Sequence, residues 1–310
     1  MLGRKNRGEN ALSNLDIGEH ERQDINAQVR RVLSDLGNPD PPLNLIEVRE
    51  LLNLDLHYYN SSDHGALTDL AHKMKVGGKQ ILARPTLILD VIRKASLSAL
   101  WVPDRRRILI DDSVPAPKLL WTEGHEIGHS LIPWHQQYLF GDNRFTLDPA
   151  CHAQVEAESN FAAAQLLFLQ ERFSIEAHDA GLTWENVKTL SKRYHNTLTT
   201  TLWRMIEDRD PGHPVVGLIS RHPHYPEIGT SPDGTPIRHF IFSDAFHAQF
   251  GNTTASMVFE VIGTYVTWQK RGPVGESEVS LFDINGLRHM FQFSSFCNCH
   301  DVLTFGTMVS

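Results

Sequence analysis

The sequence predicts an α+β protein, because segments with helical and strand-like apolar patterns both occur along its 310 residues. Apolar residues recur at helical spacings over 117–132 and 155–168. Short runs rich in β-branched and aromatic residues occur before these segments, at 106–111, and after them, at 239–242, 258–262, 265–268 and 279–282. We therefore expect helices packed on a small sheet, followed by a smaller α+β or mostly β C-terminal module.

The domain boundary is expected at 208–214, a polar segment with two prolines and a glycine that no helix or strand interior would carry. This linker follows a first domain over 25–207, which ends in a trailing helical segment. It precedes a C-terminal module over 215–310, to which the sequence assigns no role. Residues 1–24 lack the apolar run of a secretory signal and are expected to form a disordered N-terminal tail.

Composition narrows the class of protein. A chain with 41% apolar residues can bury a large core, and it contains no stretch long enough to span a membrane. Three cysteines without framework spacing indicate a reducing compartment, so we expect a cytoplasmic protein. The net charge of −8 argues against direct DNA binding. One helix face is locally basic, which is typical of a solvated surface; it carries Lys188, Lys192, Arg193 and Arg204.

The sequence His-Glu-Ile-Gly-His at 125–129 is a metal-binding motif of the H-E-x-x-H type. It lies in the helix predicted from about Pro117 to Ile132. On that helix His125 and His129 are four residues apart, so both imidazoles project from one face and can hold the same cation. Glu126 stands beside the first ligand, where a carboxylate can act as general base in metal-assisted hydrolysis.

A catalytic zinc site usually has three protein ligands, so a third donor is expected downstream. The helix at 155–168 places Glu156 and Asn160 four residues apart on one face. The carboxylate can bind the metal while the amide hydrogen-bonds a ligating imidazole. A loop through 141–143 and a return antiparallel helix would bring this face back to the histidines.

Together these residues carry a family resemblance. H-E-x-G-H followed by E-x-E-[AS]-N-x-x-A-A-x-L-L resembles the ImmA/IrrE family of bacterial and phage metallopeptidases, whose site is of the gluzincin type. Further similarities cover about 25–207: 43–57 resembles the opening helix and strand, 106–111 the strand before the zinc helix, and 187–206 the helices that follow. The sequence departs at Ser159 and Ala162, where the family usually has alanine and phenylalanine.

The resemblance implies a zincin-like domain that binds one Zn²⁺ through His125, His129 and Glu156. It also implies Glu126 as the catalytic base and Asn160 as a supporting group. Glu158 is the alternative third ligand, but it lies about 200° further round the helix than Glu156 and would face away.

The activity implied is a zinc-dependent endopeptidase that cleaves a regulatory protein such as a helix-turn-helix repressor from a phage, plasmid or stress locus. The alternatives are a peptidase acting on an antitoxin or other target, and a non-catalytic zinc-containing regulatory module. Glu126 counts against the last, because a binding module does not need a base. The oligomeric state is not encoded in any pattern that we recognise.

Two further features leave alternatives open. The strand at 106–111 is either an edge strand to which a substrate peptide adds or an ordinary buried strand; its candidate substrate-binding residues are Arg107, Ile108, Leu109 and Ile110. Near the C-terminus Cys297, Cys299 and His300 are candidate ligands of a second metal. Structural zinc sites prefer C-x-x-C spacing, which favours small buried apolar residues near the end of a sheet.

Overall fold

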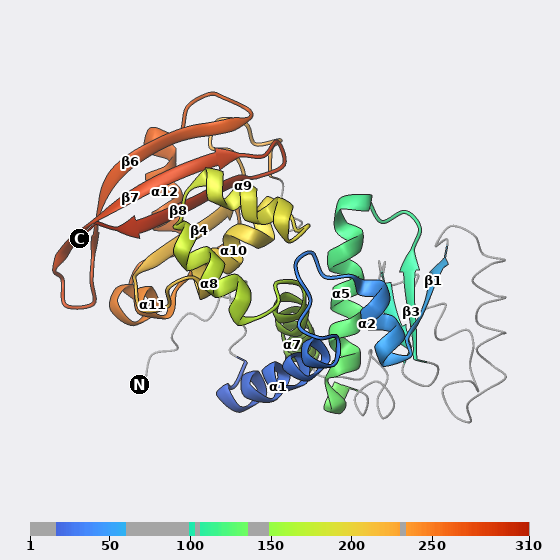
Figure 1. Cartoon of the computed structure of the whole chain (residues 1–310). Coiled ribbons are helices and arrows are strands. Elements are labelled where there is room, and N and C mark those ends of the chain that lie inside the picture. Colours follow the sequence, from blue (N-terminus) through green and yellow to red (C-terminus); the bar gives the residue numbers. More distant parts are fainter. Residues whose placement is uncertain (1–16, 60–98, 103–105, 136–148, 230–233, 310) are drawn as a thin grey trace, which may run out of the picture. The chain divides into compact units, whose positions relative to one another are not determined.

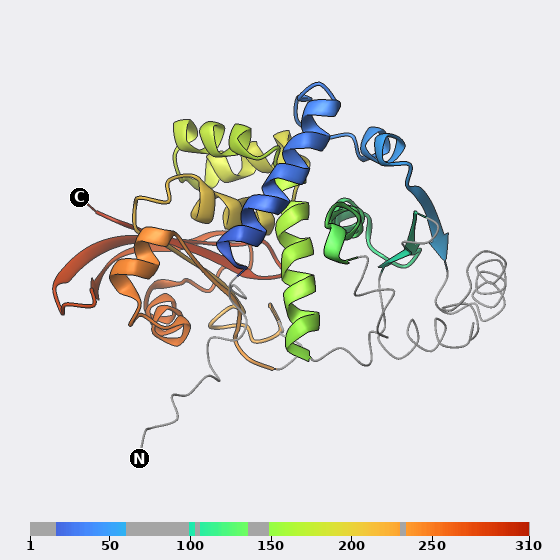
Figure 2. The ribbon, with the colours of Figure 1, turned by 90° about the horizontal axis from the view of Figure 1, so that it is seen from below.

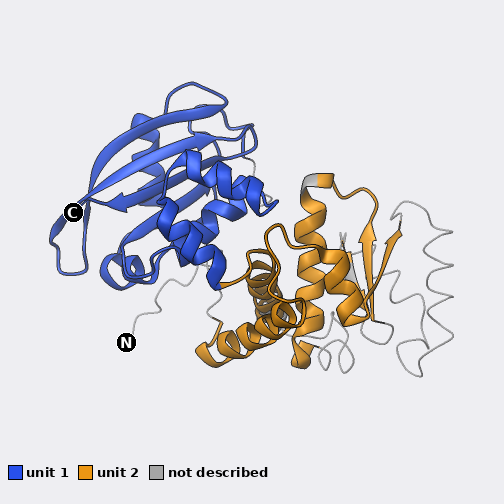
Figure 3. Ribbon diagram, in the orientation of Figure 1, with its two compact units in different colours: residues 1–14, 171–310 blue, residues 15–170 orange. Residues whose placement is uncertain are grey.

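The computed structural model describes residues 17–59, 99–102, 106–135, 149–229 and 234–309 (Figure 1). The protein is α+β, with helices and two sheets, as the sequence predicts. It forms two compact units, one of residues 15–170 and the other of residues 171–310 together with 1–14 (Figure 3). The predicted loop at 141–143 lies outside the described residues.

The first unit, residues 15–170, combines a small sheet with helices. Its elements are α1 (Glu19–Asp35), α2 (Leu45–Leu52), β1 (Asp55–Tyr59), β2 (Ala99–Val102), β3 (Arg107–Asp111), α5 (Ala116–Leu131) and α7 (Pro149–Leu167). The three-stranded sheet has the order β1-β3-β2, with β1 parallel and β2 antiparallel to β3. Helix α5 packs on β2 and β3, and α1 packs on α7.

The predicted helix boundaries are reproduced closely by α5. Pro115 is its N-cap. Pro117 lies in the first turn, where a proline loses no helical hydrogen bond. The helix ends at Leu131, two residues before Pro133, because the residue before a proline disfavours helical torsion angles. By contrast, α7 begins at Pro149, six residues before the predicted helix start at 155. The predicted disordered tail is also too long, since α1 begins at Glu19.

Helices α5 and α7 cross steeply and do not run antiparallel as predicted. Helix α5 lies in the plane of Figure 1, where α7 is seen nearly end on, and Figure 2 shows the reverse. Two glycines on α5 permit the close approach. A Cβ on Gly128 would lie 2.7 Å from the carbonyl oxygen of Ser159, and one on Gly124 would lie 2.9 Å from Leu167 Cδ1. The small residues therefore let α7 bring its polar face to the histidine helix.

Of the two alternatives for residues 106–111, the edge strand that would bind a peptide is wrong and the ordinary buried strand is confirmed. Strand β3 is the central strand, paired with β1 on one side and β2 on the other. A peptide cannot add to β3, because its backbone groups already pair within the sheet. Ile108, Leu109 and Ile110 are fully buried, as expected for a strand under helix α5. Arg107 is partly buried at the start of the strand.

The second unit, residues 171–310, is built on a five-stranded antiparallel sheet of order β5-β4-β8-β7-β6. Its elements are α8 (Glu171–Ala180), α9 (Trp184–Arg193), α10 (Leu198–Asp208), β4 (Val215–Ser220), β5 (Ile237–Phe242), α11 (Asp244–Phe250), α12 (Ala255–Tyr265), β6 (Gly272–Phe282), β7 (Arg288–Cys297) and β8 (Val302–Met308).

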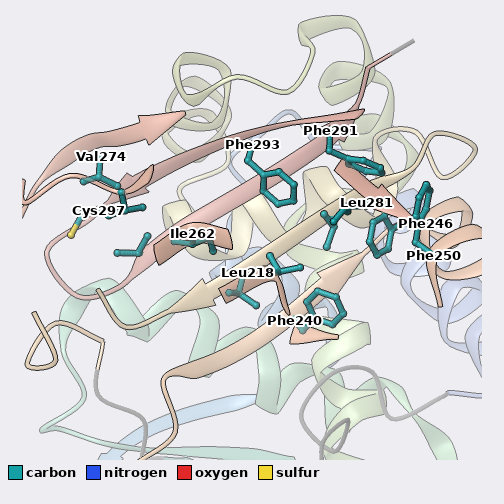
Figure 4. Close-up of a cluster of buried hydrophobic side chains, with 14 of the residues drawn as sticks. Leu218, Phe240, Phe246, Phe250, Ile262, Val274, Leu281, Phe291, Phe293 and Cys297 are labelled. Carbon is teal, nitrogen blue, oxygen red and sulfur yellow. The ribbon is translucent and has the colours of Figure 1, made fainter. Parts of the chain in front are cut away.

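Helices cover both faces of this sheet. Figure 2 shows α8 to α10 on one side and α11 and α12 on the other. Strand β4 is buried over its whole length, which explains its continuous apolar sequence. Leu218 of β4 packs in a buried apolar core together with Phe246, Phe250 and Phe291 (Figure 4), and Val216 belongs to the same core.

The opposite face of the sheet binds the helices that the sequence analysis assigned to the first domain. A Cβ on Gly217 would overlap the Ile206 side chain of α10, so this helix lies directly on β4. The ring of Trp184, at the start of α9, packs against Phe296 and Phe305, and its indole nitrogen donates to Ser294. Residues 171–208 therefore belong to the C-terminal unit, and the expected linker at 208–214 is a turn within it.

Two apolar runs in this unit, 258–262 and 265–268, were predicted as strands and are not strands. Residues 258–262 lie in α12, not in a strand, and residues 266–268 are not part of a strand either. Thr254 caps α12 by accepting a hydrogen bond from the Met257 amide. Val258 and Ile262 then fall on one buried helical face. A short apolar run does not distinguish a buried helix from a strand, and here the cap and packing decide.

The four basic residues of α9 and α10 do not form one exposed face. Arg204 is buried and pairs with Asp208 of the same helix. Arg193 forms an ion pair with Glu176 at 2.8 Å, and the Lys188 ammonium lies 4.3 Å from the centre of an aromatic ring. Most of this positive charge is thus compensated or packed.

In the described ranges, no helix is long and apolar enough to cross a membrane.

Candidate metal centre

Two imidazoles from α5 and one carboxylate from α7 converge at the crossing of these helices. The Nε2 atoms of His125 and His129 are 3.2 Å apart. Glu156 places one carboxylate oxygen 3.2 Å from His125 Nε2 and the other 3.7 Å from His129 Nε2. Within the described residues, this is the only group of three or more His, Cys, Asp or Glu side chains that could hold a metal ion.

The donor atoms fit a tetrahedral ion. Metal–ligand bonds of about 2.0–2.1 Å place neighbouring donors about 3.3 Å apart at tetrahedral angles, close to the distances within this group. Two neutral nitrogens and one carboxylate oxygen form the His₂Glu set found in zinc hydrolases. The Glu156 side chain is 33% exposed, whereas that of His129 is 1% exposed, so one side of the centre is open to solvent.

Asn160 supports the first ligand as predicted. Its Oδ1 lies 3.0 Å from Nδ1 of His125. An amide oxygen only accepts hydrogen bonds, so Nδ1 carries the proton and Nε2 has its lone pair free for a cation. Burial by itself would lower the pKa of His125, but its contacts with Glu156, Glu126 and Asn160 outweigh burial and raise it.

Glu158 does not join this group, because its side chain projects from a different side of α7. One of its carboxylate oxygens accepts hydrogen bonds from Trp134 Nε1 at 2.6 Å and from His135 Nε2 at 2.9 Å. The other accepts from Gln154 at 3.0 Å. His135 in turn places its Nδ1 3.0 Å from Nδ1 of His129. Of the two carboxylates considered as the third ligand, Glu156 is the one at the centre.

Glu126 is buried next to the ligands, at 4% exposure. It shares its surroundings with Tyr59, at the end of β1, and with Asp111, the register partner of Tyr59 on β3. Burial, together with the negative charges of Asp111 and Glu126, raises the pKa of Tyr59 to about 12. The phenol therefore keeps its proton at neutral pH and remains a hydrogen-bond donor beside the predicted base.

Sequence reasoning identified the ligand group but missed its surroundings. Tyr59 is 66 or more residues from the histidines in the chain, and nothing in its local sequence marks it. His135 lies after Pro133, beyond the end of the recognised motif, and its isolated position gives no signal of a partner. Only the backbone path after α5 turns this ring back toward His129.

The cysteines near the C-terminus do not form a metal site among the residues that the structure describes. Cys297 is buried at the end of β7 and donates to the carbonyl oxygen of Lys270. It is therefore the small apolar residue that the spacing favours, and burial raises the pKa of its thiol. Cys299 departs from that expectation, because it is exposed and has a φ of 76°.

Comparison with known proteins adds one finding about the fold. No family model matches the chain, and no curated protein matches it. The structure is similar to a solved Mycobacterium tuberculosis transcriptional regulator, with a TM-score of 0.52 and 11% identity, over 92% of this chain and 76% of that chain. At this identity the similarity concerns the arrangement of the elements alone.

Proposed function

We propose that this chain is a zinc-dependent endopeptidase of the ImmA/IrrE type, with a zincin-like first unit. One observation carries the proposal. The Nε2 atoms of His125 and His129 lie 3.2 Å apart, the two carboxylate oxygens of Glu156 lie 3.2 and 3.7 Å from them, and Glu126 is buried beside this group. The sequence resemblance of both helices to that family supports the same conclusion.

In this proposal His125, His129 and Glu156 hold the ion, which when bound activates a water and polarises the scissile carbonyl. Glu126 takes a proton from the attacking water and delivers it to the leaving amine. Its burial beside the ligand group places the carboxylate where the attacking water would be held. Asn160 keeps the His125 ring oriented through the 3.0 Å hydrogen bond at Nδ1.

The proposed substrate is a cytoplasmic regulatory protein such as a helix-turn-helix repressor, which the family resemblance favours. An antitoxin or another protein target is the alternative within the same chemistry. A different candidate is a regulatory module that binds metal without cleaving. Glu126 favours the endopeptidase, because a module that only binds metal does not need a general base.

Metal content and cleavage test the proposal together. We expect about one zinc per chain by elemental analysis of the wild type, lost in Glu156→Ala and His129→Ala. The wild type is then incubated with a peptide library derived from bacterial proteins, and cleavage products are identified by mass spectrometry.

Glu126→Gln is the matched control, because it keeps the three ligands and removes the base. We expect it to bind zinc and to give no products. A wild type without zinc after reconstitution would overturn the proposal. Zinc binding without cleavage of the library or of purified repressors would favour the regulatory module. Cleavage by Glu126→Gln at the wild-type rate would contradict the mechanism.

A further inference from the structure

A second histidine lies directly behind the metal ligand His129. His135 is fully buried, and its Nδ1 is 3.0 Å from Nδ1 of His129. On its other side its Nε2 is 2.9 Å from a carboxylate oxygen of Glu158, which is 4% exposed. Three buried polar side chains therefore form one line that ends at the metal-facing ring.

The chemistry of the groups fixes the direction of each hydrogen bond in this line. A carboxylate accepts, so His135 donates from Nε2 to Glu158. A ring that binds a cation through Nε2 carries its proton on Nδ1, so in the proposed centre His129 donates from Nδ1 and Nδ1 of His135 accepts. With its proton on Nδ1, His129 presents the Nε2 lone pair toward Glu156 and His125.

We propose that His135 and Glu158 are positioning residues that hold His129 in its metal-binding tautomer and orientation. Ligating histidines usually donate their second ring nitrogen to a carboxylate or carbonyl group. Here the Glu158 carboxylate acts through the imidazole of His135. The other histidine, His125, is instead held by the amide oxygen of Asn160. The inference rests on the metal centre proposed above and assigns a role to the carboxylate that is not a ligand.

The surroundings of Glu158 support a positioning role. Trp134 donates to the same carboxylate oxygen as His135, so this oxygen is held by two donors, whereas Gln154 donates to the other oxygen. Because Trp134 Nε1 is only a donor, the Glu158 oxygen that it contacts is an acceptor, which suits the hydrogen bond from His135 as well.

The test measures the zinc dissociation constant of the full chain by competition with a chromophoric chelator. His135→Leu removes the acceptor for His129 while keeping an apolar volume in the site. We expect about 10- to 100-fold weaker zinc binding, the usual effect of losing a partner behind a ligand. His135→Gln restores an acceptor oxygen and is expected to recover much of the loss. Gln154→Ala is the matched control, because it removes a hydrogen bond to Glu158 and leaves the line to His129 intact.

A second measurement separates positioning from folding. The visible spectrum of the Co²⁺-loaded protein reports ligand geometry, and we expect His135→Leu to change it while Gln154→Ala leaves it unchanged. Glu158→Gln keeps the side-chain volume, so it provides a folded variant with the charge removed, and we expect weaker zinc binding from it as well. Unfolding of each metal-free variant identifies any that fail to fold.

The outcomes distinguish this inference from the proposed function. Wild-type zinc affinity in both His135→Leu and Glu158→Gln, with zinc still lost in His129→Ala, overturns the positioning role and leaves the metal centre standing. Equal weakening in Gln154→Ala also overturns it, because the loss would then be general. Absence of zinc binding in the wild type removes the metal centre and this inference together.

Discussion

Replacing Gly128 with alanine is expected to push α7 away from α5 and weaken metal binding. The added Cβ would lie 2.7 Å from the carbonyl oxygen of Ser159 and 2.9 Å from its hydroxyl. The hydroxyl can rotate, but the carbonyl belongs to the α7 backbone and moves only with the helix. Ser159 also donates to the carbonyl oxygen of His125 at 2.6 Å, so the same shift disturbs the ligand helix.

The size of the effect follows from these contacts. Reaching ordinary contact at about 3.4 Å requires a displacement of about 0.7 Å, and overpacking of this kind costs about 1–3 kcal/mol. Glu156 lies on the same helix, less than one turn before Ser159, and moves with it. Metal sites tolerate ligand displacements of only about 0.2 Å. We therefore expect zinc binding at least about tenfold weaker, equivalent to about 1.4 kcal/mol.

The assay combines chelator competition for zinc with thermal unfolding of the metal-free protein. Gly263→Ala in α12 is the control, because no described atom lies within 4 Å of its added Cβ; it should be neutral or stabilise by up to about 1 kcal/mol. Gly124→Ala should cost less than Gly128→Ala, since its neighbour is the end of the flexible Leu167 side chain. Wild-type zinc affinity and stability in Gly128→Ala would refute the reasoning.

Three further outcomes are expected. Asn160→Ala removes the acceptor for His125 Nδ1, so zinc affinity in the competition assay should fall by about 10- to 100-fold; an unchanged affinity would contradict the contact. Burial alone would raise the pKa of Glu176, but hydrogen bonds, above all from Arg193, lower it. This carboxylate therefore stabilises the fold above its unfolded pKa of about 4.3, and the contribution is lost as pH falls through the lower folded value. In urea unfolding, Glu176→Gln should be less stable than wild type at pH 7, and the difference should vanish in acid; a difference independent of pH would refute this. Phe291→Ala should destabilise the C-terminal unit by about 3–5 kcal/mol in the same assay, and a loss below about 1 kcal/mol would show that the site repacks.

The ligand group was predictable from the sequence because it depends mainly on helical spacing. His125 and His129 are one turn apart on one helix, and Glu156 and Asn160 are one turn apart on another. Once both segments are helical, each pair shares a face whatever the rest of the chain does. The same regularity excluded Glu158, whose side of the helix follows from counting residues.

The neighbours of that group were not predictable, because they depend on how separate elements meet. The histidine behind His129 follows the end of α5, and its contact depends on the turn after Pro133. Tyr59 reaches the site because β1 pairs parallel to β3, a pairing that no local pattern specifies. The central position of β3 is likewise a property of the sheet and not of its own five residues.

By itself, the sequence determined the α+β class, the helix that carries the histidine motif and the identity of the two histidines and the glutamate that could hold a metal ion. These features arise from local periodicity and caps, which act within a few residues of the chain. The tertiary structure alone decided which strand lies at the centre, that α8 to α10 pack on the C-terminal sheet, and that α5 and α7 cross at Gly128. Those outcomes depend on which apolar surfaces bury each other between distant segments, and this free energy has no signature in any single stretch of residues.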